Sequence, residues 1–312
     1  MKPLRIAIIG YGKIARDQHV PAIAANPRFE LAATVSRGGS GHADLPCFKS
    51  HQDLLAAGLG LDAVTLATPP GARYAIARDC IAAGLHAMLE KPPGVTLGEV
   101  EELARCADDA RVSLFTTWHA QHNPAVAAAA DALAGETLAS LAIVWREDVR
   151  KWHPGQQWIW EPGGFGVFDA GINALSIATH IVPATLLLRA AELFFPANRQ
   201  APIAAELRLA AAGSSADCTV LLDWCHSGSE QWTIEARTAA GMALLLSEGG
   251  TRLAIDGAEA SAGGIGEYPS LYQRFVDLID ERASHVDLQP LRLVAEAFLL
   301  GRRSEVEPFR DG

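Results

Sequence analysis

Residues 4–15 constrain the fold of this chain more than any other stretch. An apolar run ends at two glycines, Gly10 and Gly12, and residues that favour a helix follow. This pattern is typical of a buried strand that turns sharply into a helix. The turn predicts a seat for a dinucleotide, because the unpaired amide groups at the start of such a helix face phosphates.

The residues of this turn have different expected roles. Gly10 permits the tight turn, and Gly12 lets the backbone approach a pyrophosphate group. Ala15 occupies the place of a third glycine and keeps the helix close to the strand. We therefore expect contacts with the cofactor from Gly10, Gly12, Lys13 and Ile14.

Length and composition limit the class of protein. The 312 residues exceed one ordinary core and favour two domains, and 49% hydrophobic with 20% charged residues is typical of soluble globular proteins. No stretch reaches the roughly 18 consecutive apolar residues of a membrane helix. The first strand begins almost at once, without a signal peptide, so we expect a cytoplasmic protein.

Charge and cysteine content argue against several functions. The net charge of -10, without a basic run, argues against nucleic acid or an anionic membrane as a partner. The five cysteines are scattered and lack the spacing of metal ligands, which indicates reduced thiols and no metal site.

Strands and helices alternate in the first part of the chain. After the glycine turn and its helix, strands are expected at 29–35, 62–67, 85–89 and 112–116, with helices at 72–83 and 97–108. This alternation indicates an α/β fold with a doubly wound, Rossmann-type parallel sheet at residues 1–119. Ligands bind at the carboxyl ends of the strands in such a sheet.

The end of the second strand selects the cofactor. Enzymes that use NAD usually carry Asp or Glu here to bind the ribose hydroxyls. Ser36 and Arg37 instead offer a hydroxyl and a guanidinium group, which suit a 2'-phosphate. We expect NADP, with NAD as the alternative cofactor. Under that alternative, Arg37 is an ordinary exposed arginine.

Two other strand ends carry candidate ligand contacts. Thr68 and Pro69 follow the strand at 62–67, and Glu90 and Lys91 follow the strand at 85–89. Both pairs are expected at the ligand-binding edge of the sheet. From its position alone, Lys91 is better explained as a solvent-facing charge.

These residues carry a family resemblance. The glycine turn, Thr68-Pro69 and especially Glu90-Lys91-Pro92 resemble the glucose-fructose oxidoreductase and inositol dehydrogenase family. The resemblance implies a second domain whose open sheet holds the substrate, and a homo-oligomer, a dimer or a tetramer, formed through that sheet. It also implies that Lys91 reaches the substrate hydroxyl beside the nicotinamide, and that the cofactor is contacted by Thr68, Pro69, Glu90 and Lys91.

The pattern changes after residue 119. Strands are expected to follow one another without helices at 138–146, 186–195, 203–211, 217–224, 231–237 and 242–246. This succession indicates a large, open, mostly antiparallel sheet, so residues 120–312 are expected to form an α+β domain for substrate binding and oligomerisation. Two amphipathic helices, one starting near Tyr268 and one at 287–303, are expected to be scaffold of this domain.

Tryptophans gather in the segment 145–173. Four of the seven tryptophans lie within its first sixteen residues, among carboxylates, amides and a histidine. A site for a neutral polyol needs this mixture, because aromatic rings lie against the C–H face of a sugar and polar side chains bind its hydroxyls. The alternative is an aromatic core for an irregular loop.

Asp169 and Asn173 are separated by one helical turn and are expected on one helix face. The family commonly has a proton-transferring histidine at the second position, whereas an asparagine amide does not titrate. Asp169 is then the nearest candidate for the proton acceptor. A carboxylate, with a reference pKa of about 4, is a weak base for an ordinary alcohol. The hemiacetal hydroxyl at C1 of an aldose is more acidic, which favours oxidation at C1, with Lys91 stabilising the developing alkoxide.

The segment 145–173 also resembles the bacterial aldose 1-dehydrogenases of this family. That resemblance implies oxidation of the C1 hydroxyl of L-arabinose, D-galactose or both to the aldonolactone, with hydride transfer to NADP. Asp169 and Lys91 are then catalytic, and the sugar contacts are Lys91, His119, Glu147, Trp152, His153, Asp169 and Asn173. Two alternatives stay open: an inositol-type dehydrogenase that oxidises a secondary hydroxyl, and a non-catalytic NADP-binding sensor or regulator.

Overall fold

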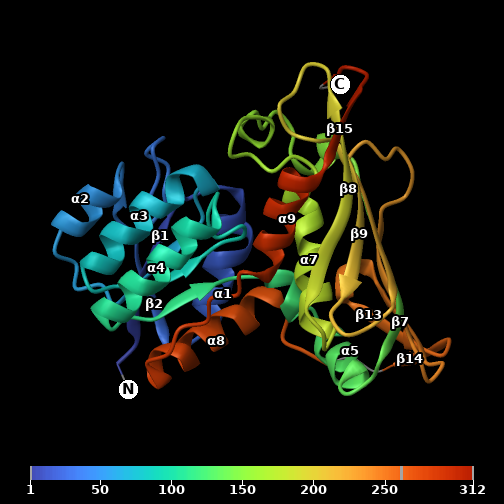
Figure 1. The fold of residues 1–312 in the computed structure, drawn as a ribbon. Helices are drawn as coiled ribbons and strands as arrows, with labels where there is room; N and C mark the ends of the chain where they lie inside the picture. The colour runs from blue at the N-terminus through green and yellow to red at the C-terminus, as the bar shows by residue number, and fades with distance from the viewer. Residues whose placement is uncertain (1, 261–262, 311–312) are drawn as a thin grey trace. The chain divides into compact units, whose positions relative to one another are not determined.

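The computed structural model describes residues 2–260 and 263–310 of the chain. They form two units, each built around one β-sheet (Figure 1). The first unit comprises Met1–His119 and Gly266–Leu288, and the second comprises Ala120–Ile265 and Gln289–Gly312. The C-terminal part of the chain is thus shared between the two units.

The six strands of the first sheet are parallel and follow the order β3-β2-β1-β4-β5-β6. The strand order reverses between β1 and β4, which is where Rossmann-type sheets hold their ligands. The strands are β1 Leu4–Ile9, β2 Phe29–Val35, β3 Cys47–Phe48, β4 Ala63–Leu66, β5 His86–Leu89 and β6 Leu114–Thr116. The doubly wound parallel sheet is confirmed. Strand β3 was not predicted, because two residues carry no periodicity.

Helices cover both faces of this sheet. Ala7 and Ile9 of β1 pack with apolar residues of α2, α3 and α4, whereas Ile6 and Ile8 pack with those of α1 and α8. This alternation places a hydrophobic core on each side of the buried strand. The helical elements are the π-helix η1 Ala15–His19, α1 Val20–Ala25, α2 His51–Ala56, α3 Pro70–Ala82, α4 Leu97–Ala110 and α8 Glu267–Glu281.

Helix α8 belongs to the first unit although it lies near the C-terminus of the chain. The sequence pattern assigns it to the second domain, and the structure differs here. Its apolar face enters the core beside Ile6 and Ile8 through the buried side chains of Tyr268, Leu271, Tyr272 and Phe275. An amphipathic pattern defines an apolar face but not the sheet that this face covers.

The second sheet has nine strands in the order β14-β13-β12-β11-β7-β10-β9-β8-β15. Strand β7 pairs in parallel with β10, and β8 with β15, while the other neighbours are antiparallel. The strands are β7 Leu138–Arg146, β8 Leu186–Pro196, β9 Ala204–Ala211, β10 Asp217–Asp223, β11 Gln231–Thr238, β12 Ala243–Ser247, β13 Arg252–Ile255, β14 Ala258–Ala260 and β15 Arg302–Val306. The large, mostly antiparallel sheet is confirmed, but β13, β14 and β15 were not predicted.

Helices cover one face of the second sheet. Helix α7 (Phe168–Ile181) lies against β7 and β11, and α9 (Gln289–Leu300) lies against β8. The predicted helix at 287–303 therefore ends three residues early, and Arg302 and Arg303 belong to β15. The remaining helical elements of this unit are α5 Val126–Leu133, α6 Val149–Trp152, η3 Trp158–Trp160 and η4 Glu248–Gly250, and the short η2 His119–His122 begins at the last residue of the first unit's N-terminal segment.

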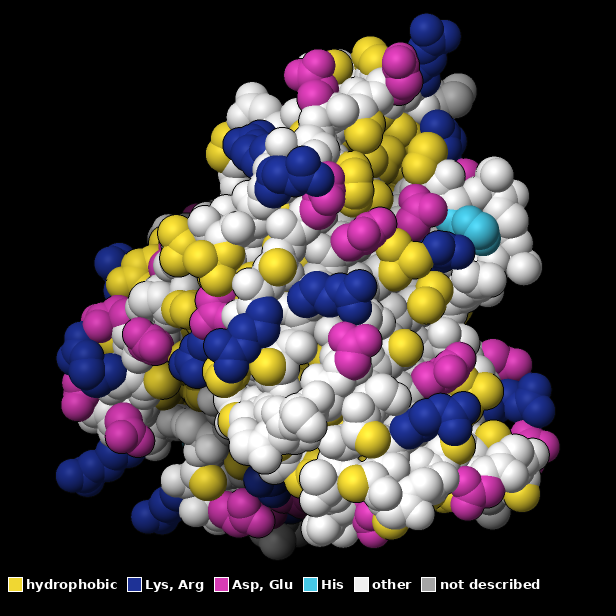
Figure 2. All heavy atoms as spheres, turned by 45° about the vertical axis from the view of Figure 1, so that its right-hand side comes forward, with side chains coloured by type: hydrophobic (Ala, Val, Ile, Leu, Met, Phe, Trp, Pro, Cys, Tyr) yellow, Lys and Arg dark blue, Asp and Glu magenta, His cyan; other side chains and the backbone are white. Residues whose placement is uncertain are grey.

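The opposite face of the second sheet is more polar. Along β9, Ala205 and Leu207 are buried, whereas Glu206 and Arg208 are exposed. In Figure 2, acidic and basic side chains are interspersed with small groups of hydrophobic side chains. In the part of the chain that the structure describes, no helix is long and apolar enough to cross a membrane.

Candidate active site

Gly10 and Gly12 lie at the end of β1, where the strand order of the first sheet reverses. Gly10 has a φ of +98°, and a Cβ there would lie 2.7 Å from the backbone of Ala67 and Thr68. Only glycine fits this position. A Cβ at Gly12 would meet no atom within 4 Å. Open space beside the Gly12 backbone is what a bound pyrophosphate requires.

The helix that follows begins in an exposed position. The side chain of Ile14 is 39% exposed, and the exposed Lys13 forms an ion pair with Asp17. The chain then forms one π-helical turn, Ala15–His19, before it continues as α1. Turns of this kind occur frequently at functional sites. The geometry leaves the backbone at Lys13 and Ile14 accessible to a ligand.

Thr68 follows the neighbouring strand, β4, and with Gly10 and Gly12 it forms a group that is called the glycine cradle below. Its hydroxyl is buried and has no hydrogen-bond partner among the described residues. Such an orphaned group costs free energy unless a ligand supplies its partner. Pro69 follows directly and precedes the first residue of α3. The open space at Gly12 and the orphaned Thr68 hydroxyl therefore fit the phosphates of a dinucleotide.

Ser36 and Arg37 lie at the end of β2. The amide group of Ser36 donates to the carbonyl oxygen of Phe48 at 2.9 Å, which fixes the strand end to β3. The side chain of Arg37 is exposed, and within residues 2–260 and 263–310 no carboxylate forms an ion pair with it. Its guanidinium group is therefore available to a ligand.

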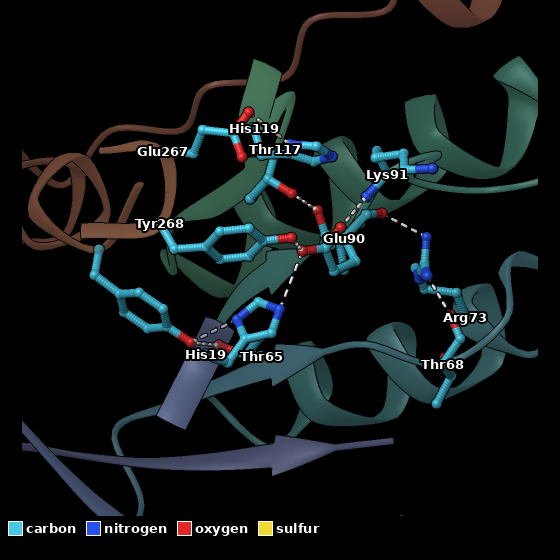
Figure 3. A network of polar contacts seen from close by, with 12 residues as sticks. His19, Thr65, Thr68, Arg73, Glu90, Lys91, Thr117, His119, Glu267 and Tyr268 are labelled. Atoms are coloured by element: carbon cyan, nitrogen blue, oxygen red, sulfur yellow. Dashed lines mark hydrogen bonds and ion pairs between the residues drawn. The ribbon is translucent and has the colours of Figure 1, made fainter. Parts of the chain in front are cut away.

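Glu90 follows β5 directly and is only 5% exposed. Figure 3 shows Glu90 among His19, Lys91 and Tyr268. Its Oε1 atom accepts a hydrogen bond from the Tyr268 hydroxyl at 2.8 Å and lies 3.0 Å from Nε2 of His19. Its Oε2 atom accepts from the backbone amide of Lys91 at 2.9 Å. Burial raises the pKa of Glu90, but the hydrogen bond from His19, the charges of His19 and His119 and the Tyr268 hydroxyl hold it well below its usual range. Glu90 is therefore a buried anion.

His119 lies just beyond β6, and its Nδ1 atom is 3.2 Å from Oε1 of Glu267. Its ring stacks on Tyr268 with the ring centroids 5.7 Å apart. Burial lowers the pKa of His119, but Glu267 and Glu90 more than offset this, so the pKa is raised even though the Lys91 charge opposes it. The negative charge of Glu90 and the positive charge of Lys91 thus have opposite effects on the pKa of His119.

The main chain around Lys91 is held by a buried arginine. Arg73 of α3 is 2% exposed, and its guanidinium group donates to the carbonyl oxygens of Thr68, Glu90 and Pro92. These bonds connect the ends of β4 and β5 on either side of Lys91. The group of first-unit residues gathered at this place, here called the Lys91 cluster, comprises His19, Glu90, Lys91, His119 and Tyr268.

In the second unit, Asp169 lies in the first turn of α7 and is 3% exposed. This end of a helix favours a negative charge. The Oδ2 atom of Asp169 is 3.5 Å from Nε2 of His153, and the half-buried Asn173 follows one turn later. A Cβ at Gly171 would lie 2.4 Å from the side chain of Leu222, so this glycine lets α7 pack closely on the sheet.

Glu147 follows β7 and is 5% exposed. Its Oε1 accepts from the indole nitrogen of Trp224 at 3.1 Å, and its Oε2 accepts from that of Trp232 at 2.9 Å. The ring of Trp224 lies 5.1 Å from that of His153, centroid to centroid. Glu147 therefore fixes two indoles, one of which packs on His153. The second-unit residues Glu147, His153, Asp169 and Asn173 are called the Asp169 cluster below.

Trp152 is more peripheral than the Asp169 cluster. It is 45% exposed, and its indole nitrogen donates to Glu230 at 2.8 Å. Its ring lies 5.8 Å from that of Trp232, which itself stacks on the buried Trp145. His153 also borders a small surface hollow, which is lined by Val149, Arg150, His153, Pro154, Gly155, Trp160 and Phe309.

The predicted site residues are divided between the units: the predicted cofactor contacts and His119 lie in the first unit, and Glu147, Trp152, His153, Asp169 and Asn173 lie in the second. His19 and Arg73 were not predicted, because a histidine in the first helix and an arginine in α3 carry no local signal of function. Tyr268 was predicted as the start of a scaffold helix and, with Trp232, as a residue that could border the pocket, but not as a partner of Glu90. Among residues 2–260 and 263–310, no group of three or more His, Cys, Asp or Glu side chains could hold a metal ion.

Comparisons with known proteins agree with this architecture. Residues 4–117 match GFO_IDH_MocA, an oxidoreductase family with an NAD-binding Rossmann fold. The chain is 45% identical to galactose 1-dehydrogenase of Pseudomonas fluorescens over the full length of both. It superimposes with a TM-score of 0.94 on a D-galactose-1-dehydrogenase protein from Rhizobium etli, at 47% identity over 99% of each chain. A 3-ketoreductase from Actinomadura kijaniata shares the fold, with a TM-score of 0.82 at 20% identity, over 97% of this chain and 99% of that one.

The strand order and glycine cradle define a dinucleotide-binding protein of the Rossmann class. The 45% sequence identity to galactose 1-dehydrogenase over the full length of both proteins assigns the chain to one family within this class. The chain belongs to the GFO_IDH_MocA family of oxidoreductases, which confirms the resemblance seen in the sequence.

Proposed function

We propose that this protein is an NADP-dependent aldose 1-dehydrogenase that oxidises the C1 hydroxyl of D-galactose, L-arabinose or both to the aldonolactone. One observation carries the proposal: a buried carboxylate, Asp169, lies 3.5 Å from His153, while the titratable histidine common in the family is replaced by Asn173. The galactose 1-dehydrogenases that are 45% and 47% identical to the chain support the substrate class.

The chain's own residues supply the cofactor seat. Gly10, Gly12 and the backbone at Lys13 and Ile14 take the pyrophosphate, with Thr68 and Pro69 at the adjoining strand end. Ser36 and Arg37 take the 2'-phosphate, because a guanidinium group binds phosphate through paired, charge-assisted hydrogen bonds. When bound, NADP supplies the acceptor for the hydride that leaves C1.

Asp169 takes the proton of the C1 hydroxyl. A carboxylate is a weak base, but the C1 hydroxyl of an aldose is a hemiacetal and releases its proton more readily than an ordinary alcohol. His153, 3.5 Å away, holds the Asp169 carboxylate in one orientation. The ammonium group of Lys91 stabilises the negative charge that develops on the C1 oxygen.

The remaining polar residues bind the other hydroxyls of the sugar. Asn173 offers both a donor and an acceptor from the helix face that carries Asp169. His119, Glu147 and Trp152 are further proposed contacts. For Glu147, the two indole donors support an additional role, which is to hold Trp224 against His153.

The two proposed sugars share the configuration of their ring hydroxyls at C2 to C4 and differ by a CH2OH group at C5. A pocket that binds the shared hydroxyls discriminates between them only through the space at C5, which is worth about 1–3 kcal/mol. We therefore expect both sugars to be substrates. Epimers should be poor substrates, because an altered hydroxyl leaves a buried polar group unpaired.

We also propose a homo-oligomer, a dimer or a tetramer, that forms through the outer face of the second sheet. Half-buried apolar side chains on β7, β10 and β12 support this, among them Val144, Leu221 and Leu245. Exposed apolar surface of this kind favours association. Light scattering of the purified protein would give the mass of the assembly, and a monomer would contradict this proposal.

The function is tested by mixing the purified protein with NADP or NAD and one sugar at a time. L-arabinose, D-galactose, D-glucose, D-xylose and myo-inositol form the panel, and the absorbance of the reduced cofactor is the readout. Turnover with arabinose or galactose and NADP is expected. Turnover with myo-inositol alone would favour a secondary-alcohol dehydrogenase. If the protein binds NADP but reduces it with none of these sugars, the result would favour a non-catalytic sensor.

A further inference from the structure

A chain of buried polar side chains leads to the carboxylate that precedes Lys91. The Tyr272 hydroxyl lies 3.1 Å from Oγ1 of Thr65 and 2.9 Å from Nδ1 of His19. The Nε2 atom of His19 faces Glu90 (Figure 3). Thr65, Tyr272 and His19 are fully buried. These groups come from β4, α8 and the π-helical turn, and two of these segments, α8 through Tyr268 and the π-helical turn through His19, contact the Glu90 carboxylate directly.

The ionised Glu90 carboxylate fixes the direction of the hydrogen bonds around it. A carboxylate only accepts hydrogen bonds, so His19 must donate from Nε2 and Tyr268 from its hydroxyl, while the Lys91 amide donates to the other oxygen. An amide side chain at position 90 has one oxygen and one nitrogen that only donates. With its oxygen accepting from His19 and Tyr268, glutamine would place its nitrogen against the Lys91 amide, and that amide would lose its acceptor.

The main chain at Lys91 is held from two sides. Its amide group is bound by the Glu90 carboxylate, and the carbonyl oxygens of Glu90 and Pro92 are bound by the buried guanidinium group of Arg73. With the main chain fixed before and after Lys91, the direction in which its side chain leaves the backbone is fixed as well.

We propose that Glu90 is a positioning residue for Lys91: its buried carboxylate, held by His19 and Tyr268, fixes the main chain at Lys91 and so aims the Lys91 ammonium group at the C1 oxygen. The claim that Lys91 is aimed at the C1 oxygen rests on the proposed function. The claim that Glu90 fixes the main chain at Lys91 does not depend on it. Helix α8 thereby contributes to the site through Tyr268, whose hydroxyl donates to the Glu90 carboxylate.

Hydrogen exchange of the protein without cofactor or sugar tests the main-chain part. Pro92 and Pro93 have no amide hydrogen, so a peptide that ends at Pro93 reports on Lys91 as its last exchangeable amide. Glu90→Gln should speed exchange at Lys91 on the order of fivefold to tenfold, because one buried hydrogen bond is lost. Unchanged protection at Lys91 would overturn the proposal.

A matched control separates this effect from general loosening of the core. Ser113 is 1% exposed, and its hydroxyl donates to the carbonyl oxygen of Leu278 on α8 at 3.1 Å, without contact to Glu90. Ser113→Ala removes one buried hydrogen bond to the same helix. It should lower the melting temperature and leave exchange at Lys91 unchanged. Equal acceleration in both variants would overturn the proposal.

A double-mutant cycle tests the part that concerns the reaction. Glu90→Gln should lower kcat/KM for the sugar on the order of tenfold or more, because a misplaced Lys91 loses its alignment. In a Lys91→Ala background the same substitution should change kcat/KM by less than about twofold, since residues that act through one another are not additive. Equal losses in both backgrounds would overturn the proposal.

Tyr268→Phe is a milder variant that can replace Glu90→Gln in the double-mutant cycle if Glu90→Gln does not fold. Tyr268→Phe removes one donor to Glu90 and keeps the packing of the ring, so it should show the same non-additivity with Lys91→Ala to a smaller degree. Additive effects here would also overturn the proposal. If the wild type oxidises no sugar, the proposed function fails, while the exchange experiment still decides whether Glu90 fixes the Lys91 backbone.

Discussion

The Nε2 atom of His153 lies 3.5 Å from the Oδ2 atom of Asp169. The histidine ends the short helix α6, and the aspartate lies in the first turn of α7, so two elements of the tryptophan-rich segment meet at this pair. Asp169 is 3% exposed, and a charge so deeply buried needs a partner. The pair is the centre of the proposed chemistry.

Replacement of Asp169 by Asn should abolish turnover. The amide has nearly the shape of the carboxylate but cannot take a proton, so kcat should fall by about a hundredfold to ten-thousandfold. Binding of NADP, measured by quenching of tryptophan fluorescence, should be unchanged. A variant with turnover close to that of the wild type would remove Asp169 from this role.

Replacement of Arg37 by Ala should weaken the preference for NADP. The exposed guanidinium group is proposed to bind the 2'-phosphate, and such a charged hydrogen bond contributes about 1.5–3 kcal/mol. KM for NADP should therefore rise about tenfold or more, while KM for NAD changes little. Equal changes in the two KM values would contradict the assignment of Arg37.

Replacement of Gly12 by Ala separates folding from cofactor binding. A Cβ there meets no protein atom within 4 Å, so the melting temperature without cofactor should stay close to that of the wild type. The same methyl group would occupy the space of the pyrophosphate, so Kd for NADP should rise about tenfold or more.

Gly98→Ala is the matched control for this experiment. A Cβ at Gly98 of α4 also meets no atom within 4 Å, at a place with no proposed ligand. This variant should bind NADP like the wild type and gain stability of about 0.5–1 kcal/mol, because alanine is the better helix former. Normal NADP binding by Gly12→Ala would show that the backbone at Gly12 does not bind the pyrophosphate.

Replacement of Glu267 by Gln should lower the pKa of His119. Burial lowers this pKa, and the carboxylate of Glu267, 3.2 Å away, is the largest effect that opposes burial. The wild-type pKa is raised above the ordinary 6.5 of histidine. His119 therefore contributes stability that is fully present below pH 6.5 and is lost as the pH rises through the folded-state pKa.

Two measurements check this prediction. Titration of the His119 ring by NMR should give a lower pKa in Glu267→Gln than in the wild type. The melting temperature of the wild type should fall as the pH rises through the folded-state pKa of His119. This part of the decrease should be absent in His119→Gln. An unchanged His119 pKa in Glu267→Gln would show that Glu267 is not the cause of the shift.

The first sheet was largely predictable because its signals are local. The apolar run before Gly10 marks a strand end, and Gly84, which follows the last residues of α3 with a φ of +81°, marks a helix end, in both cases through a few neighbouring residues. The long strands of the second sheet were predicted for the same reason. Strand β3 and the C-terminal strand β15 are short or lack alternation, so no periodic pattern marked them.

The partners of the site residues were not predictable, because they are distant in the sequence. Glu90 pairs with His19 and Tyr268, which are 71 and 178 residues away. Glu147 pairs with Trp224 and Trp232 at separations of 77 and 85 residues. Local patterns indicate which residues are polar and lie near a strand end, but only tertiary packing determines which side chains meet.

Oxidation of D-galactose labelled with deuterium at C1 tests the central claim most directly. If hydride leaves C1, the reduced NADP formed by the protein should carry the deuterium, and mass spectrometry of the cofactor detects it. The reaction should also be slower than with unlabelled sugar if hydride transfer limits the rate. Reduced cofactor without deuterium would mean that another hydroxyl is oxidised, and would contradict the assignment of the protein as an aldose 1-dehydrogenase.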